Sequence, residues 1–125
     1  SAAQAAEALR ASGIATVIIT MGARGAFVVA ADGARLVPGF KVKTLDTTAA
    51  GDVFNAALAT ALAEGKLLQD AVIFANAAAA LSVTRAGAQP SAPRRAEVER
   101  LLKSASRQGA MAAAPGRRGS GAPKK

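Results

Sequence analysis

The stretch Asp46-Thr47-Thr48-Ala49-Ala50-Gly51-Asp52 lies between a strand-like run and an apolar helical run. Small residues and a glycine at a helix entrance let backbone N–H groups close on an oxyanion. Asp52 follows at once, where a carboxylate can take the proton from a hydroxyl that attacks a phosphate. The stretch therefore suggests phosphoryl transfer to an alcohol. The alternative is an ordinary loop, in which Gly51 permits a turn and Asp52 caps the helix.

Two further observations favour the chemical interpretation. Asp46 lies six residues before Asp52, at the end of the strand-like run, where a carboxylate can serve a cation near the phosphates. The chain also has no histidine and no cysteine, which excludes disulfides, thiolate metal sites and the commonest general base. Catalysis would therefore use carboxylates, backbone amides and Lys or Arg.

The composition is that of one small domain with a core of small side chains. The 125 residues are 51% apolar and include no Trp, no Tyr and four Phe. No pocket for the alcohol is evident. No apolar run approaches the roughly 20 residues that span a bilayer, and no signal-peptide pattern opens the chain. We expect a cytoplasmic protein without membrane contact.

The first half predicts a helix followed by short strands. Residues 2–12 form an alanine-rich helix that Gly13 stops. The β-branched run Ala15–Met21 predicts a strand buried on both faces, and helix followed by buried strand indicates an α/β sheet of parallel character. The remaining expected elements are a turn at 22–25, a strand at 26–31, a hairpin at Asp32-Gly33, and strands at 34–37 and 40–45.

The second half predicts helices. Apolar residues, Leu62 among them, recur at helical spacing from Gly51 to Gly65, and a second helix follows over residues 67–84. A loop at 87–93 and a short amphipathic helix at 94–103 complete the expected domain, residues 1–104.

The composition of residues 105–125, which is rich in Gly, Ala and Pro, predicts a disordered basic tail. The tail carries five basic side chains and no acidic one, so it supplies five of the eight net positive charges. Binding of nucleic acid would use these charges, but the tail has no aromatic residue for stacking on bases. We therefore favour a solubilising tail over a nucleic-acid partner.

Three weaker candidates accompany the central stretch. The turn Thr20-Met21-Gly22-Ala23-Arg24-Gly25 lets a nucleotide phosphate approach the backbone, although a plain tight turn has the same pattern, and it is not a Walker P-loop. Asn76 could face a purine or ribose, or bond to a neighbouring loop. The last candidates surround the loop after the second helix, as ligands of a monovalent cation or as a plain helix exit: Ser82, Arg85, Gly87 and Ser91.

Taken together, these motifs resemble the C-terminal part of the ribokinase-like (phosphofructokinase B-type) carbohydrate kinases. Asp46–Asp52, followed by Val53 and Phe54, matches the family pattern D-T-x-[AG]-A-G-D. Thr20–Gly25 matches its T-x-G-x-x-G turn, and Ala77–Ser91 is similar to the end of the ribokinase members. The resemblance implies a three-layer α/β/α fold, of which residues 1–104 would be the C-terminal, nucleotide-binding portion.

The resemblance also implies roles for individual residues. Asp52 would be the catalytic base and contact the sugar, and the amides of Ala49, Ala50, Gly51 and Asp52 would form an anion hole. The residues at the ATP would be Thr20, Met21, Gly22, Ala23, Arg24, Gly25, Gly51 and Asn76. The residues holding an activating K⁺ would be Asp46, Thr48, Ser82, Arg85, Gly87 and Ser91. Mg²⁺ would arrive with the ATP phosphates.

The implied activity is ATP-dependent phosphorylation of a sugar, with ribose favoured and fructose, a deoxy-ketosugar acid or a nucleoside as alternatives. The family's Gly-Gly signature near the sugar pocket has no counterpart here. We therefore expect a fragment or truncated gene product, from an enzyme that dimerises when complete. A non-catalytic remnant that binds nucleotide is the competing interpretation.

Overall fold

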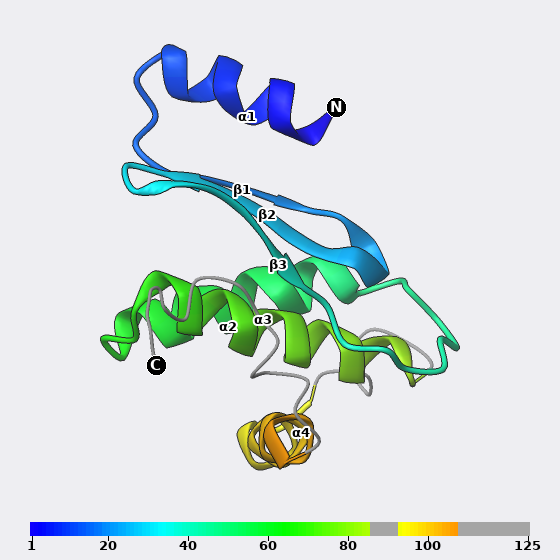
Figure 1. Cartoon of the computed structure of the whole chain (residues 1–125). Helices are drawn as coiled ribbons and strands as arrows, with labels where there is room; N and C mark the ends of the chain where they lie inside the picture. Colours follow the sequence, from blue (N-terminus) through cyan, green and yellow to red (C-terminus); the bar gives the residue numbers. More distant parts are fainter. Residues whose placement is uncertain (86–92, 108–125) are drawn as a thin grey trace.

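A small sheet separates one helix from three others in the computed structural model, which describes residues 1–85 and 93–107. Helix α1 covers one face of the sheet, α2 and α3 cover the other, and α4 packs beyond them (Figure 1). The helices are α1 (Ala2–Ala11), α2 (Ala50–Ala63), α3 (Leu68–Val83) and α4 (Arg95–Arg107). This layering matches the expected α/β/α arrangement. No helix in the described ranges has the length and apolarity needed to cross a membrane.

The sheet is antiparallel, so the expected parallel character is wrong for the described strands. Its order is β1-β2-β3, and the strands are β1 (Val17–Thr20), β2 (Gly25–Ala30) and β3 (Gly33–Pro38). A short 3₁₀ turn at Gly22–Arg24 joins β1 to β2, and a tight turn at Asp32 joins β2 to β3. Connections this short cannot return a chain to a parallel neighbour, which needs a crossover of a dozen or more residues.

The strand buried on both faces is β2 rather than β1. Ala26 and Val28 are fully buried against α2 and α3, while Val29 is buried on the α1 side with Ala6. Strand β1 lies at an edge of the three-stranded sheet, and its residues grade from buried Val17 to exposed Thr20. The β-branched run was correctly identified as a strand, but its sequence could not reveal which strand occupies the centre.

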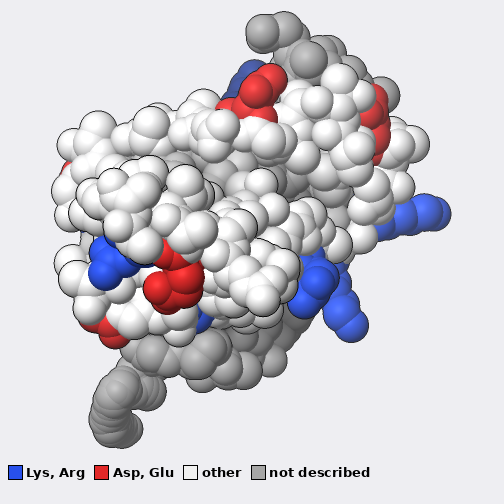
Figure 2. All heavy atoms as spheres, turned by 90° about the horizontal axis from the view of Figure 1, so that it is seen from above, with Lys and Arg blue, Asp and Glu red and all other residues white. Residues whose placement is uncertain are grey.

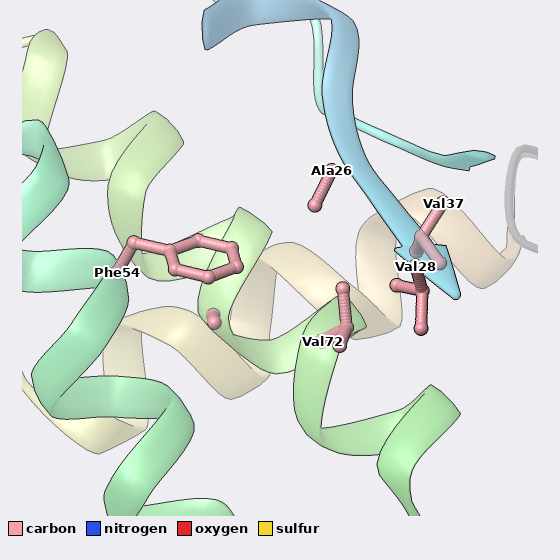
Figure 3. Packing of buried hydrophobic residues seen from close by; sticks show 6 residues of the cluster. Ala26, Val28, Val37, Phe54 and Val72 are labelled. Atoms are coloured by element: carbon pink, nitrogen blue, oxygen red, sulfur yellow. The ribbon is translucent and has the colours of Figure 1, made fainter. Parts of the chain in front are cut away.

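The main core lies between the sheet and the helix pair α2–α3. Figure 3 shows Phe54 of α2 and Val72 of α3 lying close to Ala26, Val28 and Val37 of the sheet. A second cluster of buried residues lies where the three C-terminal helices meet, and it consists of Ala61, Ala71, Phe74, Ala77, Ala78 and Val98. Alanines let these helices approach closely. Leu62, one of the apolar residues at the expected helical spacing, is 43% exposed.

The surface on the α1 side carries few charges. Figure 2 shows separate small groups of basic and acidic side chains on a largely uncharged face. Leu9 of α1 and Ile14 after it are 43% and 45% exposed. A small sheet with an open edge and such apolar side chains leaves surface available for association with further polypeptide.

Two segments differ from the expected elements. Residues 40–45 form no strand, because β3 ends at Pro38, which has no N–H to donate, and no strand in the described part pairs with this segment. Helix α4 continues past Lys103 to Arg107, so the first three residues of the expected tail are helical. The rest of that tail, 108–125, and most of the expected loop at 87–93 lie outside the described residues.

Gly25 allows the turn after β1 to pack against the end of β3. Its φ is +107°, and a Cβ placed on it would lie 2.1 Å from the carbonyl oxygen of Val37. Gly39 approaches the same turn from the other side, where a Cβ would lie 2.6 Å from the carbonyl oxygen of Ala23. Two backbone segments therefore touch where side chains would separate them.

We predict that Gly25→Ala destabilises the protein far more than Gly33→Ala. Gly33 also has a positive φ, +126°, but no heavy atom lies within 4 Å of its hypothetical Cβ. The control variant should lose about 1–3 kcal/mol from backbone strain alone. Gly25→Ala should lose stability from the same backbone strain and, in addition, from the disrupted packing of the turn. Urea denaturation of both variants measures the difference, and equal midpoints would contradict it.

Candidate functional site

A pocket of about 560 Å³ opens between the turn after β1, the segment after β3, and helices α2 and α3. Seven of the eight residues expected at a nucleotide line it, and these are Thr20, Gly22, Ala23, Arg24, Gly25, Gly51 and Asn76. The eighth, Met21, does not line it. Its N–H donates to the carbonyl of Gly25 at 2.8 Å and so closes the turn. Residues as far apart in sequence as Thr20 and Val83 thus meet at one cavity.

Asn76 is fixed by the end of β3. Its side chain is buried, with the residue 6% exposed, and its Nδ2 donates to the carbonyls of Val37 at 3.1 Å and Pro38 at 3.2 Å. The sequence left open whether this amide faces a ligand or a neighbouring segment, and the described contacts are to the strand end. Its Oδ1 accepts no hydrogen bond within the described part of the chain, and Asn76 lines the pocket.

One face of α3 forms a wall of the pocket. Besides Asn76, the pocket is lined by Ala79, Ala80 and Val83, which are three, four and seven residues further on. This spacing places all four on one side of a helix. Sequence reasoning missed the three apolar residues as site residues, although their helical phase relative to Asn76 was a usable signal. It also missed the loop residues that line the pocket, which are Gly39, Phe40, Lys41, Val42, Thr44 and Thr47.

The N-terminus of α2 presents unpaired amides beside the pocket. Its N-cap is Ala49, which makes no side-chain capping bond. The amides of Ala49, Gly51 and Asp52 donate to no acceptor among the described residues, whereas that of Ala50 donates to the carbonyl of Thr47 at 3.2 Å. Free amides and the positive end of the helix dipole together suit an oxyanion. Ala50 and Gly51 both line the pocket.

Asp52 occupies the first turn of α2, directly after Gly51. It is exposed, lies at the margin of the pocket rather than in its lining, and makes no hydrogen bond or ion pair within the described ranges. The capping alternative raised from the sequence does not describe this helix, because its N-cap is Ala49. Asp52 is thus an accessible carboxylate next to two unpaired amides.

Asp46 organises the loop that leads into α2. Its Oδ1 accepts hydrogen bonds from the Thr48 N–H at 2.8 Å and from the Thr48 hydroxyl. The N–H groups of Leu45 and Asp46 both donate to the carbonyl of Val83, at 2.6 and 3.0 Å. The loop therefore rests against the C-terminal end of α3.

This contact brings four of the expected cation ligands to one region. Asp46 and Thr48 lie on the loop, and buried Ser82 and Arg85 lie at the end of α3. The other two, Gly87 and Ser91, are outside the described residues. Within the described part, no group of three or more acidic side chains is placed to hold a metal ion.

The Arg85 side chain joins α3 to α4. It forms an ion pair with Glu97, whose other carboxylate oxygen accepts the backbone N–H of Arg94 at 2.8 Å. These two contacts, the backbone one first, hold the pKa of Glu97 below its ordinary value of 4.5. Glu97 thus helps to fix the start of α4 against the end of α3.

We predict that Glu97→Gln lowers stability at pH 7 and that its effect fades in acid. A lowered folded-state pKa stabilises the protein above the ordinary carboxyl value and loses this contribution as the pH falls through the folded pKa. Unfolding midpoints at pH 7 and pH 3 measure this. Glu99→Gln is the control, because its 3.7 Å pair with Arg95 is more exposed and contributes little. If Glu97→Gln lowered the unfolding midpoint equally at both pH values, the prediction would be wrong.

Residues 1–95 match the family model described as pfkB family carbohydrate kinase. The chain belongs to this family. Among curated relatives of this pfkB member, ribokinase from Haemophilus influenzae is 49% identical over 105 residues, or 84% of the chain and 34% of the relative. Ribokinase from Bacillus subtilis is 52% identical over 88 residues, which cover 70% of the chain and 30% of the relative. The resemblance drawn from the motifs is thereby confirmed.

Solved structures give the same result for the fold of this pfkB chain. A ribokinase from Thermotoga maritima is 54% identical with a TM-score of 0.78, covering 80% of this chain and 34% of that one. A ribokinase from Arabidopsis thaliana, solved with ribose and ATP, is 36% identical with a TM-score of 0.76, covering 81% and 33%. The expected ribokinase-like α/β fold is confirmed. The chain spans about a third of the length of these relatives.

Proposed function

We propose that this chain is the nucleotide-binding part of an ATP-dependent sugar kinase. One observation carries the proposal: the pocket is lined by the glycine turn, the amide-bearing end of α2 and Asn76, with Asp52 at its margin. The proposed reaction transfers the γ-phosphate of ATP to a sugar hydroxyl. Membership of a carbohydrate kinase family supports it.

The proposed nucleotide position follows the chemistry of the pocket walls. The apolar face of α3 at Ala79, Ala80 and Val83 suits a purine ring. Thr20 and the Gly22–Gly25 turn, where the backbone is accessible, suit ribose and phosphates, and Met21 contributes by closing that turn. The free Oδ1 of Asn76 can accept from a ribose hydroxyl or from an exocyclic amine of the base.

The proposed chemistry uses Asp52 and the start of α2. The Asp52 carboxylate takes the proton of the sugar hydroxyl while the sugar oxygen attacks the γ-phosphorus, and the bond to the ADP oxygen breaks. The Ala49, Gly51 and Asp52 amides would stabilise the negative charge that develops on the transferred group. Ala50 would hold the entrance of the helix through its bond to Thr47.

We propose two cations with different roles. Mg²⁺ comes with the ATP phosphates and neutralises part of their charge. K⁺ would be held where the Asp46 loop meets α3, because the Asp46 carboxylate, the Thr48 hydroxyl and the negative end of the helix dipole offer oxygen ligands there. Ser82, Arg85, Gly87 and Ser91, several of them through main-chain oxygens, complete the proposed K⁺ site.

Ribose is the proposed acceptor. The ribokinase relatives at 49% and 52% identity support it, compared with 40% for a fructokinase from Oryza sativa. About two thirds of each relative has no counterpart in these 125 residues, so we propose that segments outside them bind the sugar. A second candidate, nucleotide binding without transfer, rests on this same partial coverage.

We predict that the chain binds Mg-ADP with about 1:1 stoichiometry, and more tightly in potassium than in lithium. Titration calorimetry in the two buffers measures this. Asp46→Asn should remove most of the potassium effect while leaving the lithium affinity unchanged, because the amide lacks the charge that attracts the cation. A folded chain that binds no Mg-ADP in either buffer would contradict the proposed nucleotide site.

We also predict that Asp52→Asn abolishes transfer without weakening ATP binding. The assay is phosphorylation of ribose by a chimeric ribokinase from Haemophilus influenzae whose corresponding third is replaced by residues 1–104. Loss of a general base should lower kcat about 10²–10⁴-fold. Asp70→Asn is the matched control, because Asp70 is an exposed carboxylate in the first turn of α3. Comparable turnover in the Asp52 and Asp70 variants would remove Asp52 from the role of base.

A further inference from the structure

The pocket contains positive charge without a counterion. Among the described residues that line it, two are basic, Arg24 and Lys41, and none is acidic. Neither makes an ion pair or a side-chain hydrogen bond within the described part of the chain. In contrast, Arg35, Arg85 and Arg95 are each paired with an acidic side chain. Unpaired like charges in a concave, largely apolar site favour an anionic ligand.

The positions of the two basic residues are coupled through the backbone. The N–H of Gly39 donates to the carbonyl of Arg24 at 3.3 Å, and Gly39 packs closely against Ala23. Lys41 is two residues after Gly39. The hydrogen bond of Gly39 therefore holds the start of the Lys41 segment against the turn that carries Arg24. Asn76 holds the chain just before this point through the carbonyls of Val37 and Pro38.

We propose that Lys41 binds the phosphate groups of the nucleotide together with Arg24. The inference rests on the proposed nucleotide site and adds to it a residue that the sequence motifs did not indicate. A lysine ammonium is a compact charge with three donors on a flexible stem, so an exposed lysine at a pocket wall can reach phosphate oxygens in several geometries. Lys41 therefore discriminates nucleotides by phosphate charge, not by base.

The chain contains a matched control for this role. Lys43 lies two residues further on the same loop and is also exposed, but it does not line the pocket. Removing either lysine lowers the net charge of the chain by one unit. A general electrostatic effect on an anionic ligand would therefore appear in both variants, whereas a contact inside the pocket would appear in one.

The test is calorimetric titration of the 125-residue chain and its variants with ADP, AMP and adenosine. Lys41→Met keeps most of the aliphatic stem and removes the charge. We expect it to weaken ADP binding about 5- to 20-fold, AMP binding less, and adenosine binding not at all. Lys43→Met should match the unmodified chain, and Lys41→Arg should retain ADP affinity. Raising the salt concentration should reduce the difference in ADP affinity between Lys41→Met and the unmodified chain.

The outcomes separate this inference from the proposed function. ADP binding by the unmodified chain with no loss in Lys41→Met overturns the role of Lys41 and leaves the nucleotide site in place. Equal losses in Lys41→Met and Lys43→Met, or an equal loss for adenosine, also overturn it. Failure of the folded, unmodified chain to bind ADP overturns the proposed site and the role of Lys41 with it.

Discussion

The site depends on a close approach of two backbone segments, at Gly25 and at Gly39. A side chain on either residue would overlap the backbone of the opposite segment. Because the segments touch, the turn after β1 and the loop after β3 become two walls of one pocket, joined by the Gly39 to Arg24 hydrogen bond. Asn76 secures the same junction from α3. The glycine pattern that suits a phosphate therefore also has a structural purpose, which is to let the pocket close on that side.

Helix α3 connects the core to the site. Its buried alanines let α2 and α4 pack closely, and the face of the same helix that starts at Asn76 lines the pocket. At its C-terminal end, the carbonyl of Val83 receives two N–H groups from the loop that carries Asp46. The position of Asp46, and through it the entrance of α2, is therefore set by the packing of α3. A change in that packing would be transmitted to the amides beside Asp52.

The unpaired edge of the sheet is consistent with the greater length of the relatives. Strand β1 is an edge within the described residues, and exposed apolar side chains such as Leu9 and Ile14 lie near it in sequence. The chain covers about a third of the ribokinases to which it is similar. The pocket proposed for the nucleotide, in contrast, is lined by described residues of this chain. This division agrees with our proposal that the nucleotide binds within these residues and that segments outside them bind the sugar.

The sequence by itself determined the α2 and α3 helices, the β2–β3 hairpin and the family, because helical periodicity, the Asp32-Gly33 turn and the Asp46–Asp52 motif are local patterns. It also indicated part of the pocket lining, namely Thr20, the Gly22–Gly25 turn, Gly51 and Asn76. It could not determine that the described strands run antiparallel, that β2 is central among them, or that none of them pairs with residues 40–45. Strand pairing depends on residues far apart in the chain. Only the tertiary structure placed Lys41 in the pocket and bonded Asn76 to the end of β3. Both depend on how β3 packs across α3, and no local pattern records that contact.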